Sequence, residues 1–105
     1  MSKNVFADLG FDETEAAALQ AKAFLFMQLQ DVLEKSQKNQ LELAKMIGID
    51  QPKVSKIMSG KMDEFSLDRI MLFLQKMGID IHIGVTPAPK NREAKVVIER
   101  DLVSA

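Results

Sequence analysis

Hydrophobic positions recur with helical spacing in two short stretches, residues 41–47 and 54–58, which flank a corner at Gly48, Ile49 and Asp50. Repeats of three and four residues place apolar side chains on one face of a helix. The residues expected to face inward are Leu41, Ala44, Ile47, Val54, Ile57 and Met58. The pattern predicts two short helices joined by a tight turn, with Ile49 as an apolar plug beneath it.

Capping residues define the limits of these two helices. Asn39 can cap the first helix, with Glu42 at the N3 position as its reciprocal partner. Gly48 can end that helix in the left-handed conformation, and Asp50 can cap the second helix. We therefore expect a helix-turn-helix over residues 39–60.

A longer helix is predicted upstream, over residues 13–35, because Asp12 and Glu15 form a capping signal and no Gly or Pro follows within that range. Its expected core-facing stripe is Leu25, Leu29, Val32 and Leu33. Residues 23–27 are apolar on every side, which is more than one buried face explains. A dimer partner, another protein or an arm formed by residues 1–11 could cover the second face. Residues 1–11 could equally be a frayed terminus.

A last helix, beginning at Ser66 and ending at Gly78, precedes a segment with a different pattern. Residues 79–86 alternate between apolar and polar positions, as in a half-buried strand. A turn at residues 87–91 would lead into a second strand and complete a hairpin. The apolar side of the first strand would consist of Ile79, Ile81, Ile83 and Val85.

A lone hairpin is marginal in water, and its open edge invites pairing. We therefore expect these four apolar residues to form a two-fold homodimer; the alternative is that the hairpin packs on its own core and the protein is a monomer. The expected fold class is mostly α, a helix-turn-helix bundle with a C-terminal β-hairpin or dimerising strand. Its expected parts are an N-terminal arm (1–11), a helical domain (12–78) that contains the helix-turn-helix (39–60), a strand or hairpin (79–100) and a tail (101–105).

Composition narrows the functional classes. The chain has 105 residues, of which 47% are hydrophobic, enough for one compact domain. It contains no cysteine, so disulfides and thiolate zinc sites are excluded and a cytoplasmic location is expected. No apolar run is long enough to span a membrane, and no secretory signal is evident. His82 is the only histidine and has no cluster of ligands or nucleophiles around it, so we expect no catalytic residues, metal or cofactor.

The formal net charge is −1, but it is unevenly distributed. Residues 37–62 contain five lysines and two acidic residues, a balance of +3, as phosphate binding requires. The first turns of a recognition helix enter the major groove, where glutamine can read adenine and lysine can read guanine. The candidate base contacts are Gln51, Pro52, Lys53 and Lys56, and the candidate phosphate contacts are Asn39, Gln40, Ser55, Ser59 and Lys61. The alternative is a polar helix face that is merely solvated.

The segment QLELAKMIGIDQPKVSKIMSGK, followed by FSLDRIMLFLQKMGIDIHI, resembles the Cro/C1-type (XRE) helix-turn-helix, which has the lambda-repressor-like fold. Together with the opening NVFADLGF, it most resembles the small antitoxins that accompany RelE/HigB-like toxins, and the similarity covers residues 4–87. The resemblance implies base contacts by Gln51, Pro52, Lys53 and Lys56, and phosphate contacts by Gln40, Ser59 and Lys61. Asn39 departs from the family, which usually has Thr or Ser there.

A two-fold dimer formed through the predicted strand would set its two recognition helices about 34 Å apart. The resemblance implies a repressor that binds a palindromic operator in double-stranded DNA. It also implies an antitoxin that regulates its own toxin-antitoxin operon. Two alternatives remain: a stand-alone phage-type repressor without a toxin partner, and a protein-interaction module that does not bind DNA. An adjacent gene for a small basic toxin would favour the antitoxin.

Overall fold

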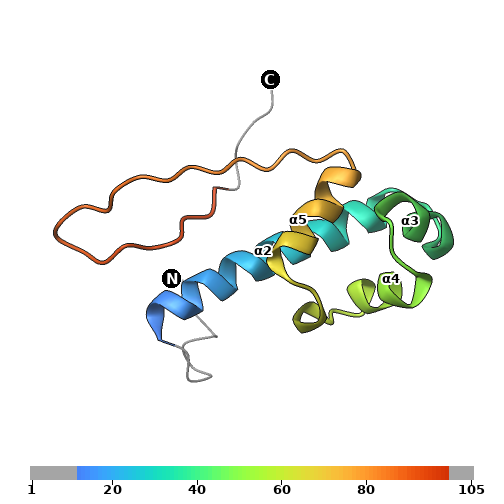
Figure 1. The fold of residues 1–105 in the computed structure, drawn as a ribbon, viewed down its shortest axis with the longest axis horizontal. Helices are drawn as coiled ribbons and strands as arrows, with labels where there is room; N and C mark the ends of the chain where they lie inside the picture. The colour runs from blue at the N-terminus through green and yellow to red at the C-terminus, as the bar shows by residue number, and fades with distance from the viewer. Residues whose placement is uncertain (1–11, 100–105) are drawn as a thin grey trace. The chain divides into compact units, whose positions relative to one another are not determined.

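Figure 1 shows the fold as a computed structural model, which describes residues 12–99. In this range the elements are, in order, α2 (Glu13–Lys35), α3 (Gln40–Ile47), α4 (Gln51–Met58), the 3-10 helix η1 (Met62–Glu64) and α5 (Leu67–Lys76). Residues 25–83 form one compact unit, and the described residues 12–24 and 84–99 belong to a second. The expected arm at residues 1–11 and the tail at residues 101–105 lie outside the described residues.

The core of the unit formed by residues 25–83 collects side chains from α2, α3, α4 and α5. Its buried members are Phe26, Leu29, Leu33, Leu43, Ala44, Ile47, Val54, Ile57, Phe65, Ile70, Phe73 and Leu74. The ring of Phe65 has its centroid 6.2 Å from that of Phe26, and it meets Phe73 edge-on at 6.1 Å. Burial of these side chains stabilises the unit, and the three rings connect α2 to α5.

Helix α2 begins where the sequence predicts. The backbone amide of Glu15 donates a 2.7 Å hydrogen bond to Oδ1 of Asp12, so the expected N-terminal cap is present. Leu29 and Leu33 are buried along the predicted stripe. Within the apolar stretch 23–27, Phe26 enters the core whereas Met27 keeps 63% of its surface exposed. It stays a prediction that a dimer partner, another protein or an arm formed by residues 1–11 covers the second apolar face of α2.

Both helices of the predicted helix-turn-helix are present, and one core assignment on α3 is wrong. Leu41 is 53% exposed, whereas Leu43, which was not among the expected inward residues, is 3% exposed and joins Ala44 and Ile47 in the core. At 3.6 residues per turn, Leu41 lies about 60° from Ala44 around the helix axis, on the side opposite Leu43 and Ile47. Its side chain is therefore turned away from those two residues. The spacing of apolar residues alone fitted either set, and the packing of α3 against α4 and α5 decides between them.

The end of α5 follows its predicted glycine. Gly78 has φ of +80°, and its amide donates to the carbonyl of Gln75 at 2.9 Å. The amide of Ile79 reaches back to the carbonyl of Leu74 at 3.0 Å. These two bonds satisfy carbonyls that the helix leaves without partners and direct the chain away from α5.

The predicted β-hairpin or dimerising strand is wrong. Between residues 79 and 99 the described chain contains no strand, only irregular backbone with a turn at residues 90–91. Of the four residues assigned to its apolar side, Ile81 packs against the core, while Ile83 and Val85 are 72% and 90% exposed and Ile79 is also exposed. A strand needs a hydrogen-bonded neighbour and a surface to cover, and alternation along the sequence supplies neither.

Candidate nucleic-acid interface

The candidate interface is built on α4, whose two faces differ in burial. Val54 and Ile57 are fully buried on the inner side. The four candidate base-contacting residues are all exposed: Gln51, Pro52, Lys53 and Lys56. The structure therefore brings the predicted set together on the outer side of one short helix.

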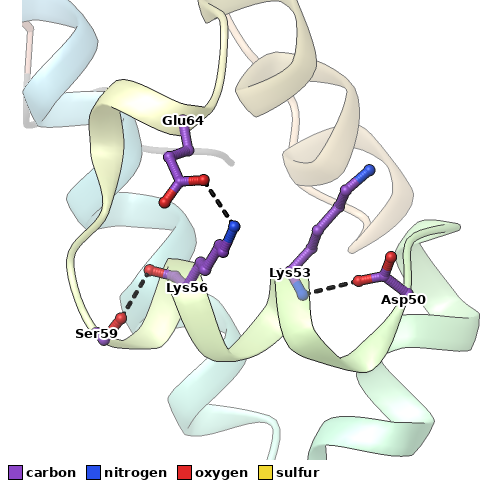
Figure 2. A network of polar contacts seen from close by, with 5 residues as sticks. All are labelled: Asp50, Lys53, Lys56, Ser59 and Glu64. Atoms are coloured by element: carbon purple, nitrogen blue, oxygen red, sulfur yellow. Dashed lines mark hydrogen bonds and ion pairs between the residues drawn. The ribbon is translucent and has the colours of Figure 1, made fainter.

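The start of α4 is fixed by its capping residue. Asp50 has an extended backbone, and its Oδ1 accepts a 2.9 Å hydrogen bond from the backbone amide of Lys53, as Figure 2 shows. Pro52 lies in the first turn, where a missing amide donor does no harm. The first turn, which carries Gln51 and Lys53, is thus held in helical geometry by local bonds.

Lys56 has a partner that the sequence did not predict. Its Nζ donates to Oε1 of Glu64, which follows α4 on η1, at 2.7 Å (Figure 2). The hydrogen bond and negative charge of Glu64 raise the pKa of the Lys56 ammonium group above its usual value of 10.5. Lys56 is therefore fully protonated near neutral pH, with one of its donors occupied.

Sequence reasoning missed Glu64 because it lies eight positions after Lys56, beyond the three- and four-residue spacings that bring side chains together on a helix. The chain turns back through Gly60, which has φ of +87°, and η1. The available signal was the pair of acidic residues, Asp63 and Glu64, directly after the basic segment.

The candidate phosphate contacts lie at the start of α3 and around the end of α4. Asn39 completes the predicted capping box: its Oδ1 accepts from the amide of Glu42 at 2.8 Å, and its own amide donates to Oε1 of Glu42 at 3.2 Å. The hydroxyl of Ser59 donates to the carbonyl of Lys56 at 3.2 Å. Ser55, Ser59 and Lys61 are exposed and Gln40 is half-buried.

Two contacts tie this region to the rest of the unit. The side-chain amide of Gln30 in α2 donates a 2.8 Å hydrogen bond to the carbonyl of Ile57 near the end of α4. At the turn between α3 and α4, Gly48 has φ of +79°, and a Cβ added there would lie 2.9 Å from Nζ of Lys76 in α5. The turn thus favours glycine for its backbone conformation, whereas the flexible end of the Lys76 side chain could move aside for a Cβ.

Other kinds of site have little support in the described residues. No group of three or more His, Cys, Asp or Glu side chains between residues 12 and 99 could hold a metal ion. His82 lines a cavity of about 380 Å³, together with Met71, Gln75 and the neighbouring residues 79–83. Asp80 is the other titratable residue in that lining. Within the same range, no helix has the length and apolar character to cross a membrane.

Comparisons with known proteins agree with this geometry. Residues 5–86, which include the whole candidate interface, match a protein family described as a helix-turn-helix domain. A solved structure of a protein whose name assigns it to the XRE family of transcriptional regulators is similar, with a TM-score of 0.71 and 31% sequence identity over 87% of this chain and 99% of that one. No curated protein matches the chain.

Proposed function

Because the chain belongs to the XRE-type helix-turn-helix family of DNA-binding transcriptional regulators, we propose that it is a repressor whose α4 reads a specific operator in the major groove. The proposal rests on the difference in burial between the two faces of α4. Its inner face is locked into the core by Val54 and Ile57, so its outer face can be presented to DNA as a rigid surface.

The chemistry of the exposed residues suits base reading near the start of α4. Gln51 can donate to and accept from the edge of adenine, and Lys53 can donate to O6 and N7 of guanine. Pro52 offers an apolar surface to a thymine methyl group. Their shared first turn is held by the Asp50 cap, which reduces the conformational entropy lost on binding.

Phosphate contacts at both ends of the motif would fix the register of α4 on the duplex. We assign these contacts to Asn39, Gln40, Ser55, Ser59 and Lys61. The side-chain oxygen of Asn39 is occupied by the Glu42 amide, so its phosphate contact would use the side-chain nitrogen. The positive balance of residues 37–62 favours the approach of DNA.

The proposed regulator acts as a homodimer on a palindromic operator. Ile79, Ile81, Ile83 and Val85 are the proposed dimer contacts, made by apolar side chains and not by paired strands. The exposure of Ile83 and Val85 supports this assignment. Light scattering tests it: a mass near twice 11.8 kDa at micromolar concentration is expected, and the mass of a monomer throughout would exclude it.

The finer proposal is that the chain is an antitoxin that represses its own operon. It rests on the resemblance of NVFADLGF and the helix-turn-helix sequence to small antitoxins. Co-purification from the native operon tests it: a small basic toxin in the complex supports the role, and a repressor recovered alone would leave the stand-alone alternative.

DNA binding itself is tested by selecting duplexes from a random pool and measuring their mobility shift. We expect a palindromic sequence to be enriched and its mobility shift to weaken steeply as the salt concentration rises. The same site should occur in the DNA upstream of the gene that encodes the chain. Folded protein that shifts no duplex at low salt would overturn the proposal.

A further inference from the structure

We propose that Glu64 is a specificity-determining residue, which holds the ammonium group of Lys56 in place for guanine and limits its attraction to phosphates on any other sequence. This inference rests on the proposed DNA-binding function. It concerns a residue outside α4 that no sequence pattern assigns to the interface.

The geometry places a carboxylate directly beside a candidate base contact. Nζ of Lys56 and Oε1 of Glu64 are 2.7 Å apart, and Figure 2 shows the Lys56 side chain extending from α4 toward Glu64. Lys53, one turn earlier on α4, has no ion pair to an acidic residue within the described structure. The two lysines therefore differ in their electrostatic surroundings although they share a helix.

The pair is exposed to solvent, with 46% of the Lys56 side chain and 41% of the Glu64 side chain accessible. An ion pair of this kind adds little to folding stability because water screens it and ordering two long side chains loses entropy. The main effect of the ion pair is therefore on how strongly Lys56 binds other groups, which in the proposed function are the bases and phosphates of DNA.

The number of donors on the ammonium group explains how specificity arises. Lysine has three N–H donors; one is directed to Glu64, which leaves two for O6 and N7 of a guanine. The Lys56–Glu64 pair is neutral as a unit, so it gains little from the phosphate backbone that every sequence offers. It can still form hydrogen bonds to a correctly placed base. Glu64 thus suppresses the sequence-independent part of binding more than the specific part.

The test compares two duplexes: a site selected from a random pool by the wild-type protein, and a shuffled duplex of the same composition. For Glu64→Gln we expect binding of the shuffled duplex to tighten about threefold to fivefold, the size of an exposed ion pair expressed as a ratio of affinities. Its salt dependence should steepen by about 0.9 in the log–log slope, the value for one added phosphate contact. Binding of the selected site should change less, so discrimination falls.

Asp63→Asn is the matched control, because Asp63 is an exposed acid on the same 3-10 helix and is one residue from Glu64. This variant removes the same charge but not the contact with Lys56. We expect it to shift both affinities by the same factor and leave discrimination unchanged. A loss of discrimination equal to that of Glu64→Gln would mean that general charge is responsible and would overturn the inference.

A double-mutant cycle tests whether Glu64 acts through Lys56. In a Lys56→Gln background, Glu64→Gln should no longer alter discrimination; an undiminished effect would overturn the positioning role. Circular dichroism of each variant checks that the fold is retained. If wild-type protein selects a site but Glu64→Gln discriminates as well as wild type, this inference fails and the proposed function stands. If folded wild-type protein selects no site, the proposed function fails first.

Discussion

The side-chain amide of Gln30 donates a 2.8 Å hydrogen bond to the backbone carbonyl of Ile57, joining residues 27 positions apart. Gln30 lies in the second half of α2 and Ile57 in the last turn of α4, where the backbone amide of Gly60 donates to the same carbonyl at 3.1 Å. The long helix α2 thus supplies a second donor to a carbonyl at the end of α4. This contact links the scaffold to the interface without taking any residue from the exposed face of α4.

Replacing Gln30 by Ala should lower the free energy of unfolding by about 1 kcal/mol, because the partly buried Ile57 carbonyl loses one of its two donors and keeps only the Gly60 amide. The loss would be measured by urea denaturation. Gln28→Ala is the control, since Gln28 is an exposed residue on the same helix and should change stability by less than about 0.5 kcal/mol. Equal effects of the two substitutions would contradict a specific role for the Gln30 bond.

Leu43→Ala and Leu41→Ala make the same chemical change on one helix at positions of opposite burial. The first removes a core side chain and should cost about 2–5 kcal/mol of stability. The second removes an exposed one and should cost less than about 0.5 kcal/mol. Thermal or denaturant unfolding distinguishes the two variants. A larger loss of stability from Leu41→Ala would mean that Leu41 is the core residue, as the spacing alone predicted.

Gln51→Ala and Lys61→Ala should weaken DNA binding in different ways. Loss of a base contact at Gln51 should cost about 1–3 kcal/mol on the selected site and relax the preference at one base position. Loss of a phosphate contact at Lys61 should weaken all duplexes alike and reduce the salt slope by about 1. Titrations of the selected and shuffled duplexes at several salt concentrations measure both effects. A uniform loss from Gln51→Ala would remove it from the base-reading set.

The hydroxyl of Ser66 stabilises the charged form of Asp68, and this hydrogen bond is the main reason that the pKa of Asp68 lies below its usual value of 3.8. Because the pKa is lowered in the folded state, the stabilising contribution is present above about pH 4 and is lost as the pH falls through the folded-state pKa. Ser66→Ala should bring the Asp68 pKa back toward 3.8, as measured by NMR titration of the side-chain carboxyl. Ser59→Ala, on another element, should leave it unchanged.

The parts of the fold that sequence could predict are those decided by neighbouring residues. The Asn39–Glu42 capping box, the Asp50 cap and the left-handed Gly48 all depend on backbone bonds within a few positions, and each was confirmed. The choice between Leu41 and Leu43 depends instead on where α4 and α5 lie, which periodicity does not encode.

Long-range relationships account for the remaining differences. The contact between Lys56 and Glu64 requires the turn at Gly60 to bring η1 back toward α4. The alternation of residues 79–86 predicted a strand that the described chain does not contain between residues 79 and 99, because pairing requires a neighbour that alternation does not specify. Local chemistry predicted the exposed face of α4, while the partners of its side chains required the folded chain.

Only two of the eight residues of α4 are buried in the core, Val54 and Ile57. The helix is anchored largely through them and through backbone bonds at its ends, so most of its outward side chains can change without altering the scaffold. Over evolutionary time such a helix can acquire new preferences for DNA sequence through substitutions at a few exposed positions. The same property makes it a compact starting point for laboratory retargeting, in which a library at Gln51, Lys53 and Lys56 would be screened together with Glu64.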